Sequence, residues 1–173
     1  MGVKAKRWCA LLPLAVLSPL LLLWPQTRRP PLAPGPTVEV PPFTVAVTLS
    51  PAAEKRLHAL GESVKVLAYF DGDPLIGPKQ FNRPEPEIHL GSAEKLVDEK
   101  NVAAFTDARI SLSAWNRLAD KNYRVTLNTV SARRVAPDNL LECPASVTSI
   151  ETLKGRTVEV PCTLIGEPES SGR

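Results

Sequence analysis

The sequence predicts a mainly β fold of two packed sheets with two or three short helices, preceded by an N-terminal hydrophobic helix. Three observations lead to this prediction. Apolar and polar residues alternate over four segments, serine and glycine bracket a short helical stretch between two of them, and an uncharged apolar run lies near the start. The length of 173 residues suits one domain with an appendage.

The first residues are typical of an export or anchoring segment. Three basic residues among the first seven precede an uncharged run of 16 residues, Cys9–Trp24. At about 1.5 Å per residue the run forms a helix of about 24 Å, slightly shorter than a ~30 Å hydrocarbon core. We therefore assign residues 1–24 to a signal peptide or signal-anchor transmembrane helix, with residues 8–24 in contact with the membrane.

Cleavage sites after this run are poor. The nearest small residues include Ala33 and Gly35, and each of them precedes a proline, which fits badly just after a scissile bond. We therefore favour an uncleaved anchor, with the β domain on the periplasmic or extracellular side of the membrane. If the leader is cleaved, the protein is secreted.

Residues 25–42 contain seven prolines and predict an extended spacer of about 3 Å per residue. The charged residues are also distributed unevenly between the start of the chain and the remainder. Residues 1–36 contain five basic residues and no acidic one, which leaves 16 basic and 18 acidic residues in the remainder. The high pI of the chain therefore belongs to the leader. Scattered basic residues and an aromatic content of 5% exclude a nucleic-acid partner.

Residues 43–166 are predicted to form the β domain, and residues 167–173 a disordered tail. Each strand has one apolar face, which favours two sheets packed against each other. The pattern is typical of an immunoglobulin-like or transthyretin-like β-sandwich and leaves the strand order open. The predicted strands are Phe43–Leu49, Val64–Phe70, Tyr123–Val130 and Thr157–Leu164, with weaker candidates at Glu87–Leu90 and Phe105–Leu112.

Short helices are expected between the strands. Ser50 suits an N-cap, the proline after it suits the first turn, and Gly61 suits a C-terminal cap, so Pro51–Leu60 is predicted to be helical. Ser113–Ala119 and Ile150–Gly155 repeat this arrangement more weakly. We expect the helices to cover the open ends of the sandwich.

Two cysteines lie within the predicted β domain. An exported location and an even count favour a disulfide between Cys143 and Cys162. In the chain-entropy model such a loop restricts the unfolded chain by about 3 kcal/mol. Neither cysteine belongs to a Cys-x-x-Cys pair, so zinc and redox roles are not expected.

The segment Tyr69–Pro74 holds the first candidate binding residues, Asp71 and Asp73. Gly72 between them favours a tight turn. The two carboxylates could also offer oxygens to Ca²⁺, which gives the alternative of a Ca²⁺-stabilised adhesion domain. The spacing of a full calcium loop is missing, so we predict no metal site.

The second candidate segment is a polar loop after a predicted strand, with Arg133, Arg134 and Asp138. Loops on a rigid β scaffold commonly carry binding residues. An arginine pair can grip a carboxylate or a phosphate group, or simply pair with nearby carboxylates in a solvated loop.

Catalytic signatures are missing from the sequence. It has two histidines, His58 and His89, and no Gly-x-Ser-x-Gly, His-Glu-x-x-His or phosphate-loop motif. We therefore expect no enzyme activity and no cofactor. An enzyme would need convergent polar groups such as Asp71, Asp73 and His89.

The function expected from the sequence is that of an exported or membrane-anchored cell-envelope protein. Its β-sandwich would act as a non-enzymatic binding or structural module with an envelope protein as a possible partner. The alternatives are an envelope hydrolase or hydrolase inhibitor and the Ca²⁺-stabilised adhesion domain.

Overall fold

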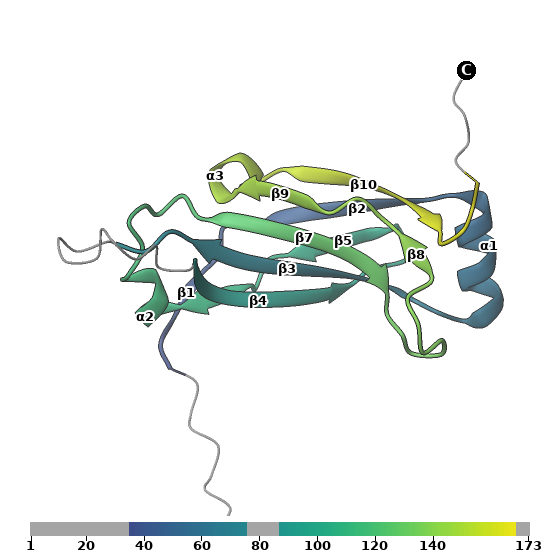
Figure 1. Cartoon of the computed structure of the whole chain (residues 1–173), viewed down its shortest axis with the longest axis horizontal. Helices are drawn as coiled ribbons and strands as arrows, with labels where there is room; N and C mark the ends of the chain where they lie inside the picture. The colour runs from purple at the N-terminus through teal and green to yellow at the C-terminus, as the bar shows by residue number, and fades with distance from the viewer. Residues whose placement is uncertain (1–34, 76–86, 169–173) are drawn as a thin grey trace, which may run out of the picture. The chain divides into compact units, whose positions relative to one another are not determined.

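A computed structural model of the protein describes residues 35–75 and 87–168 (Figure 1). These residues form ten strands and three short helices, so the prediction of a mainly β fold with packed sheets and short helices is confirmed. The hydrophobic helix predicted for residues 1–24, most of the spacer and residues 169–173 of the tail lie outside the described residues. Within the described residues, no helix is long and apolar enough to cross a membrane.

The first sheet combines the first long strand of the domain with the last strand. β2 and β10 run parallel, so that Val45 lies opposite Val158 and Val47 lies opposite Val160, whereas the outer pairs are antiparallel. The hydrogen-bonded order is β5 (Val102–Phe105), β2 (Phe43–Leu49), β10 (Thr157–Leu164) and β8 (Leu141–Glu142).

The second sheet is antiparallel throughout. A β-bulge between Phe70 and Asp71 shifts the register against the neighbouring strand. Gly91 of that strand has φ 154°, and a Cβ there would lie 3.3 Å from the carbonyl oxygen of Arg109, so the close approach favours glycine. The order is β4 (Ile88–Leu96), β3 (Val64–Gly72), β7 (Arg124–Ser131) and β9 (Ser146–Ser149).

A small ribbon extends the folded domain beyond the boundaries that the sequence analysis drew. β1 (Thr37–Glu39) pairs antiparallel with β6 (Arg109–Ser111), and Val40 just after β1 is buried. β1 and Val40 fall within residues 25–42, which sequence analysis assigned to the spacer. At the other end, Glu167 of the predicted tail accepts hydrogen bonds from the Ser50 hydroxyl and the Leu164 N–H.

The core is built from the inward faces of both sheets. Alternation in β2 and β3 buries every second residue, including Val45 and Val66, which are fully shielded from solvent. Phe43 and Phe105 stack with ring centroids 4.7 Å apart. These side chains form one hydrophobic cluster, and their packing holds the two sheets together.

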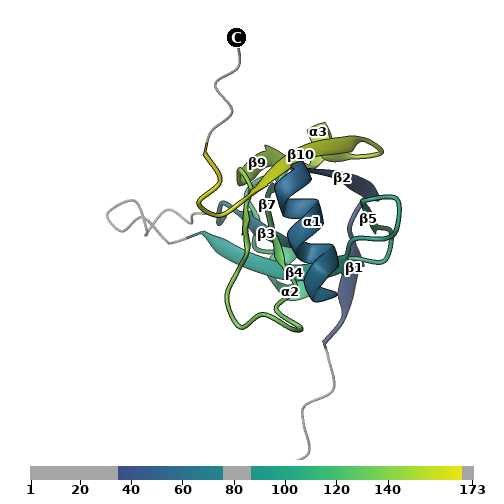
Figure 2. The same ribbon diagram turned by 90° about the vertical axis from the view of Figure 1, so that its right-hand side faces the viewer.

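α1 (Pro51–Leu60) lies at one end of the strands and faces the viewer in Figure 2. Its predicted caps are confirmed. The Ser50 side chain accepts a hydrogen bond from the Ala53 N–H, and Gly61 ends the helix with φ 66°. Ala53 and Leu57 are buried, so the helix places its apolar side against the core.

α2 (Leu112–Trp115) and α3 (Ile150–Leu153) lie at the end of the strands opposite α1 (Figure 1). Each is one turn long and repeats the capping chemistry of α1. Ser111 and Ser149 accept hydrogen bonds from the N–H groups three residues further along the chain. Both helices are shorter than the predicted Ser113–Ala119 and Ile150–Gly155, and α2 begins one residue earlier because Ser111, rather than Ser113, caps it.

Candidate functional site

Asp71 lies in a row of polar side chains that crosses the second sheet. In the strand register it stands opposite His89 of β4 and Arg124 of β7. Its Oδ1 is 2.8 Å from the Nδ1 atom of His89. The Arg124 guanidinium donates to the carboxylates of Asp73, at 3.3 Å, and Glu87. The sheet therefore brings together the three residues named for the enzyme alternative, although sequence analysis did not predict their arginine partner.

The chemistry of this cluster is that of paired surface charges. The side chains of His89 and Asp73 are 58% and 73% exposed, and each carboxylate of the cluster contacts a basic group. Among the described residues, none with a hydroxyl or thiol group is hydrogen-bonded to His89. In residues 35–75 and 87–168 no group of three or more His, Cys, Asp or Glu side chains is arranged to hold a metal ion.

The second candidate segment is organised around Glu62, a residue that sequence analysis did not single out. Glu62 follows the C-cap of α1 and is 8% exposed. Its carboxylate accepts hydrogen bonds from three successive backbone N–H groups, of Arg134, Val135 and Ala136, at 3.1, 2.8 and 3.0 Å. The Ser63 N–H donates a fourth bond, at 2.9 Å.

These four bonds set the charge state of Glu62. Burial of the carboxylate works to raise its pKa, but the four N–H donors stabilise the ionised form and lower the pKa to about 2. The carboxylate therefore stays charged at neutral pH. It ties the loop after β7 to the C-terminus of α1.

The arginine side chains of this loop do not hold Glu62, and their predicted role in binding stays a prediction. Arg133 has φ 56°, a left-handed conformation, and it precedes the three N–H groups that surround Glu62. The side chains of Arg133, Arg134 and Asp138 are exposed. The carboxylate held here belongs to the protein itself, and the backbone rather than the guanidinium groups holds it.

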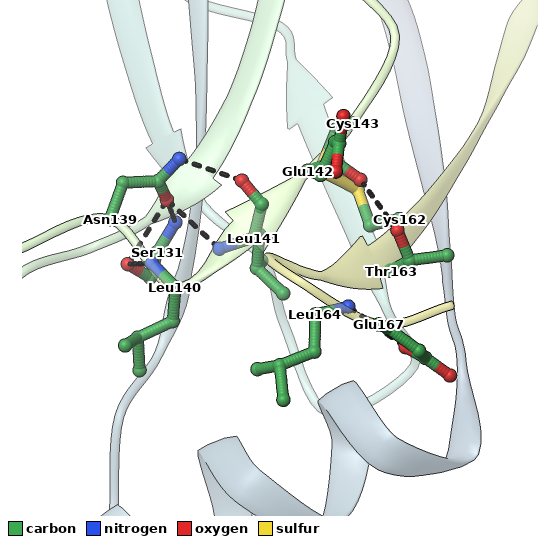
Figure 3. Close-up of a disulfide and its surroundings, with 10 residues drawn as sticks. All are labelled: Ser131, Asn139, Leu140, Leu141, Glu142, Cys143, Cys162, Thr163, Leu164 and Glu167. Carbon is green, nitrogen blue, oxygen red and sulfur yellow. Dashed lines mark hydrogen bonds between the residues drawn. A yellow bond between two sulfur atoms is a disulfide. The ribbon is translucent and has the colours of Figure 1, made fainter. Parts of the chain in front are cut away.

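A buried polar contact fixes the other end of the same loop (Figure 3). The Asn139 Oδ1 atom accepts hydrogen bonds from the N–H and hydroxyl of Ser131 and from the Leu141 N–H. The Ser131 hydroxyl in turn accepts from the Leu140 N–H at 3.0 Å. Ser131 is fully buried, so these bonds satisfy polar groups that water cannot reach.

The predicted disulfide between Cys143 and Cys162 is confirmed (Figure 3). It joins the residue after β8 to β10, with Cα atoms 4.4 Å apart. Cys162 is buried in the core cluster. The bond therefore links the end of β8, the edge strand that follows the loop after β7, to its neighbour β10.

The two candidate segments lie at opposite ends of the second sheet. Ser131, just before the arginine loop, pairs with Val64 at the start of β3, and Asp71 lies near the end of β3. Seven residues of strand at about 3.3 Å each separate these positions by about 20 Å. The structure therefore does not bring Asp71 and Asp73 together with Arg133, Arg134 and Asp138 into one surface.

A pocket of about 460 Å³ opens at the end of the strands that carries α2 and α3. Its walls combine residues with apolar side chains from β1, the segment after it, α2, the residue before β7 and α3: Val38, Pro41, Trp115, Tyr123 and Ile150. Charged residues of the same pocket are Glu39, Asp120, Lys121 and Glu151, all of them exposed. Such concave, mostly apolar sites with a few polar groups are typical of ligand binding.

Aromatic contacts give this pocket a defined wall. The rings of Trp115 and Tyr123 meet edge to face, with centroids 5.9 Å apart and planes at 80°. The Lys121 Nζ atom lies 4.8 Å from the Trp115 ring centroid and donates a hydrogen bond to the Trp115 carbonyl. The pocket thus already holds one ammonium group on an aromatic face.

Tyr123 carries an unpaired polar atom. The residue is 3% exposed, and its buried hydroxyl has no hydrogen-bond partner among the described residues. Burial, together with the negative charge of Glu151, raises the pKa of this hydroxyl, so it remains protonated. An unsatisfied buried hydroxyl costs roughly 1–3 kcal/mol. The ring itself belongs to the core cluster and packs edge to face against Phe70, with centroids 6.1 Å apart.

Sequence analysis placed Trp115 within a predicted short helix and Tyr123 at the start of a predicted strand, and it did not predict the pocket. A weak signal was present, because the chain has nine Phe, Trp and Tyr residues and these two lie only eight positions apart. The other walls come from β1 and α3, which are distant in sequence. Their convergence depends on the tertiary fold.

Comparisons with known proteins complete the description of the site. No protein-family model, curated protein or solved structure matches this chain.

Proposed function

We propose that the protein is an exported or membrane-anchored component of the cell envelope whose β domain acts as a non-enzymatic binding module. The observation that carries the binding part is the pocket between β1, α2 and α3. It combines an aromatic wall with charged residues. Concave sites that combine apolar walls with a few polar groups are typical of ligand binding.

The Cys143–Cys162 bond supports the location outside the cytoplasm. Disulfides persist in secreted, periplasmic and cell-surface proteins and are rare where thiols are kept reduced. The basic, then apolar, composition of residues 1–24 supports the same location. In this proposal residues 8–24 contact the membrane, and the β domain meets an envelope protein or another envelope component on the far side.

Site-specific photocrosslinking in the producing cells tests the binding function. A photoreactive amino acid at Glu151, on the rim of the pocket, should give a discrete adduct. The same amino acid at Glu54, an exposed residue of α1 at the opposite end of the domain, serves as the matched control. If both positions give the same adducts, or neither gives any, the proposed binding surface is wrong.

One observation favours the alternative of an envelope hydrolase or hydrolase inhibitor. Asp71 and His89 are in contact at 2.8 Å, and an aspartate that orients a histidine is a common part of hydrolytic sites. Turnover of an envelope substrate that disappears in His89→Gln, while the variant remains folded, would establish this alternative in place of the binding module.

The finer classification of the fold is also a proposal. Two four-stranded sheets around a shared core support an immunoglobulin-like or transthyretin-like sandwich. The parallel pairing of β2 with β10 distinguishes the domain from the purely antiparallel sheets of that architecture.

A further inference from the structure

The charge of the pocket rim points to the chemistry of its ligand. Three carboxylates, those of Glu39, Asp120 and Glu151, line the pocket together with a single ammonium group, that of Lys121. Glu39 also pairs with Arg109 at 3.3 Å. The other two carboxylates line the same pocket as the Trp115–Tyr123 wall and outnumber the single ammonium group, so the pocket attracts cations and repels anions.

Lys121 shows where a cation fits. Its ammonium group lies over the Trp115 ring and donates to the Trp115 carbonyl oxygen. Lys121 is itself exposed and belongs to the turn between α2 and β7. A long, exposed side chain is readily displaced because its charge can return to water. The contact is therefore an internal example of the interaction that an incoming cation would make.

The aromatic wall supplies a second observation. Tyr123 lines the pocket and packs edge to face against Trp115, so the ring that would receive the cation is held in place. Val38 and Pro41 provide apolar surface on which the carbon stem of a ligand can pack.

We propose that the pocket binds an organic cation, an ammonium or guanidinium group on an apolar stem, which takes the place of Lys121 over Trp115. The stem packs against Val38 and Pro41, and Glu151 balances the charge. This proposal rests on the binding function proposed above and names the ligand class of the same pocket. The cation can come from a basic side chain of a partner polypeptide or from a free diamine.

Binding of matched probes to the full-length chain in detergent micelles tests the proposal. The cationic probes are Nα-acetyl-lysine N-methylamide and pentane-1,5-diamine, and the neutral probe is the norleucine analogue of the first. NMR reports on the indole N–H of Trp115, identified by its loss in Trp115→Phe. We expect the lysine probe to bind about tenfold more tightly than the norleucine probe, with an affinity that falls as salt is added. The stronger of the two cationic probes identifies the source of the cation.

Charge variants sharpen the test. Lys121→Met removes the internal competitor and should tighten binding of the lysine probe about threefold, whereas Glu151→Gln should weaken it about threefold. Lys55→Met and Glu54→Gln on α1, at the opposite end of the domain, are the matched controls and should change nothing.

Tyr123→Phe tests whether the aromatic wall, rather than the hydroxyl, takes part in binding. The variant keeps the ring and loses only a buried hydroxyl, so it should bind the lysine probe as tightly as wild type. Its melting temperature should be unchanged or higher because an unpaired buried hydroxyl has been removed. Severalfold weaker binding would show that the ligand contacts the hydroxyl and would overturn the proposed seat over Trp115.

The outcomes distinguish this proposal from the binding function on which it rests. Equal affinity for the lysine and norleucine probes overturns the cation proposal and leaves the binding function standing. Weaker binding in Lys121→Met also overturns it, because Lys121 would then contact the ligand directly. If no probe shifts the Trp115 indole signal, the cation proposal is wrong, and the crosslinking experiment decides separately whether the domain binds anything.

Discussion

The Oε2 atom of Glu62 accepts a hydrogen bond at 2.8 Å from the backbone N–H of Val135, which lies 73 residues further along the chain. This contact joins the C-terminus of α1 to the loop after β7. It places a charged carboxylate in a site that is closed to water on most sides. The stability of this end of the domain therefore depends on one acidic residue.

Substitution of Glu62 by glutamine should destabilise the domain by about 2–3 kcal/mol. The amide keeps the shape of the side chain but loses the charge that strengthens the bonds from the backbone N–H groups. Urea unfolding at pH 7 measures the change. Glu54→Gln, on the exposed side of α1, is the matched control and should stay within about 0.5 kcal/mol of wild type. Equal effects of the two variants would contradict the role of Glu62.

The same carboxylate should make stability depend on pH. Its pKa is lowered to about 2 in the folded protein, from a usual value of 4.5. Its contribution is therefore fully present above pH 4.5 and is lost as the pH falls towards 2. The difference in unfolding free energy between wild type and Glu62→Gln should shrink over this interval. Other carboxyls with lowered pKa, such as that of Glu167, cancel in this comparison.

Removal of the Cys143–Cys162 bond should cost about 3 kcal/mol in the chain-entropy model. The expected readout is a lower melting temperature on addition of a thiol reductant. A variant with both cysteines replaced by serine should have the lower melting temperature from the start and should not respond to the reductant. A response in that variant would show that the reductant acts elsewhere.

Thr129 of β7 offers a substitution that should increase stability. It is 2% exposed, and its hydroxyl has no hydrogen-bond partner among the described residues. Thr129→Val keeps the branched shape and removes the unpaired hydroxyl, so we expect a gain of about 1 kcal/mol in urea unfolding. Ser131→Ala, two residues later, is an instructive contrast. It leaves the Leu140 N–H without its acceptor and should destabilise the domain.

The contact between Asp71 and His89 should contribute little to stability. The His89 side chain is 58% exposed, and surface ion pairs typically contribute about 0.2–1 kcal/mol. A double-mutant cycle with Asp71→Asn and His89→Gln measures the coupling. A coupling energy above about 2 kcal/mol would indicate a preorganised pair and would favour the hydrolase alternative.

The strands that sequence predicted are those with one buried face. Val45 and Val66 lie in segments where every second residue faces the core. The alternation of apolar and polar residues in the sequence therefore matches the alternation of buried and exposed side chains. β4 was predicted only to Leu90, because from Gly91 onward its side chains are partly or fully exposed and no apolar face recurs. β8 and β9 were missed because they are two and four residues long.

Site features, too, were predicted where they depend on local sequence and missed where they depend on the tertiary fold. The disulfide and the caps of α1 follow from local composition and compartment, and both were predicted. The partners of Glu62 are backbone N–H groups, which every residue except proline has, so no sequence pattern marks them. The meeting of Asp71 with His89 depends on strand register, and the pocket around Tyr123 depends on the tertiary arrangement of β1, α2 and α3. These relationships exist only in the folded chain.

The parallel pairing of β2 with β10 constrains how the domain can fold. Thr44 pairs with Thr157, so the first sheet cannot form until nearly the whole domain has been synthesised. Contacts between such distant residues require closure of a long loop and slow the folding reaction. The second sheet, whose strands are closer in sequence, can form earlier. During this interval β2 has only β5 as a neighbour, so the time until β10 arrives is when the chain is most exposed to aggregation.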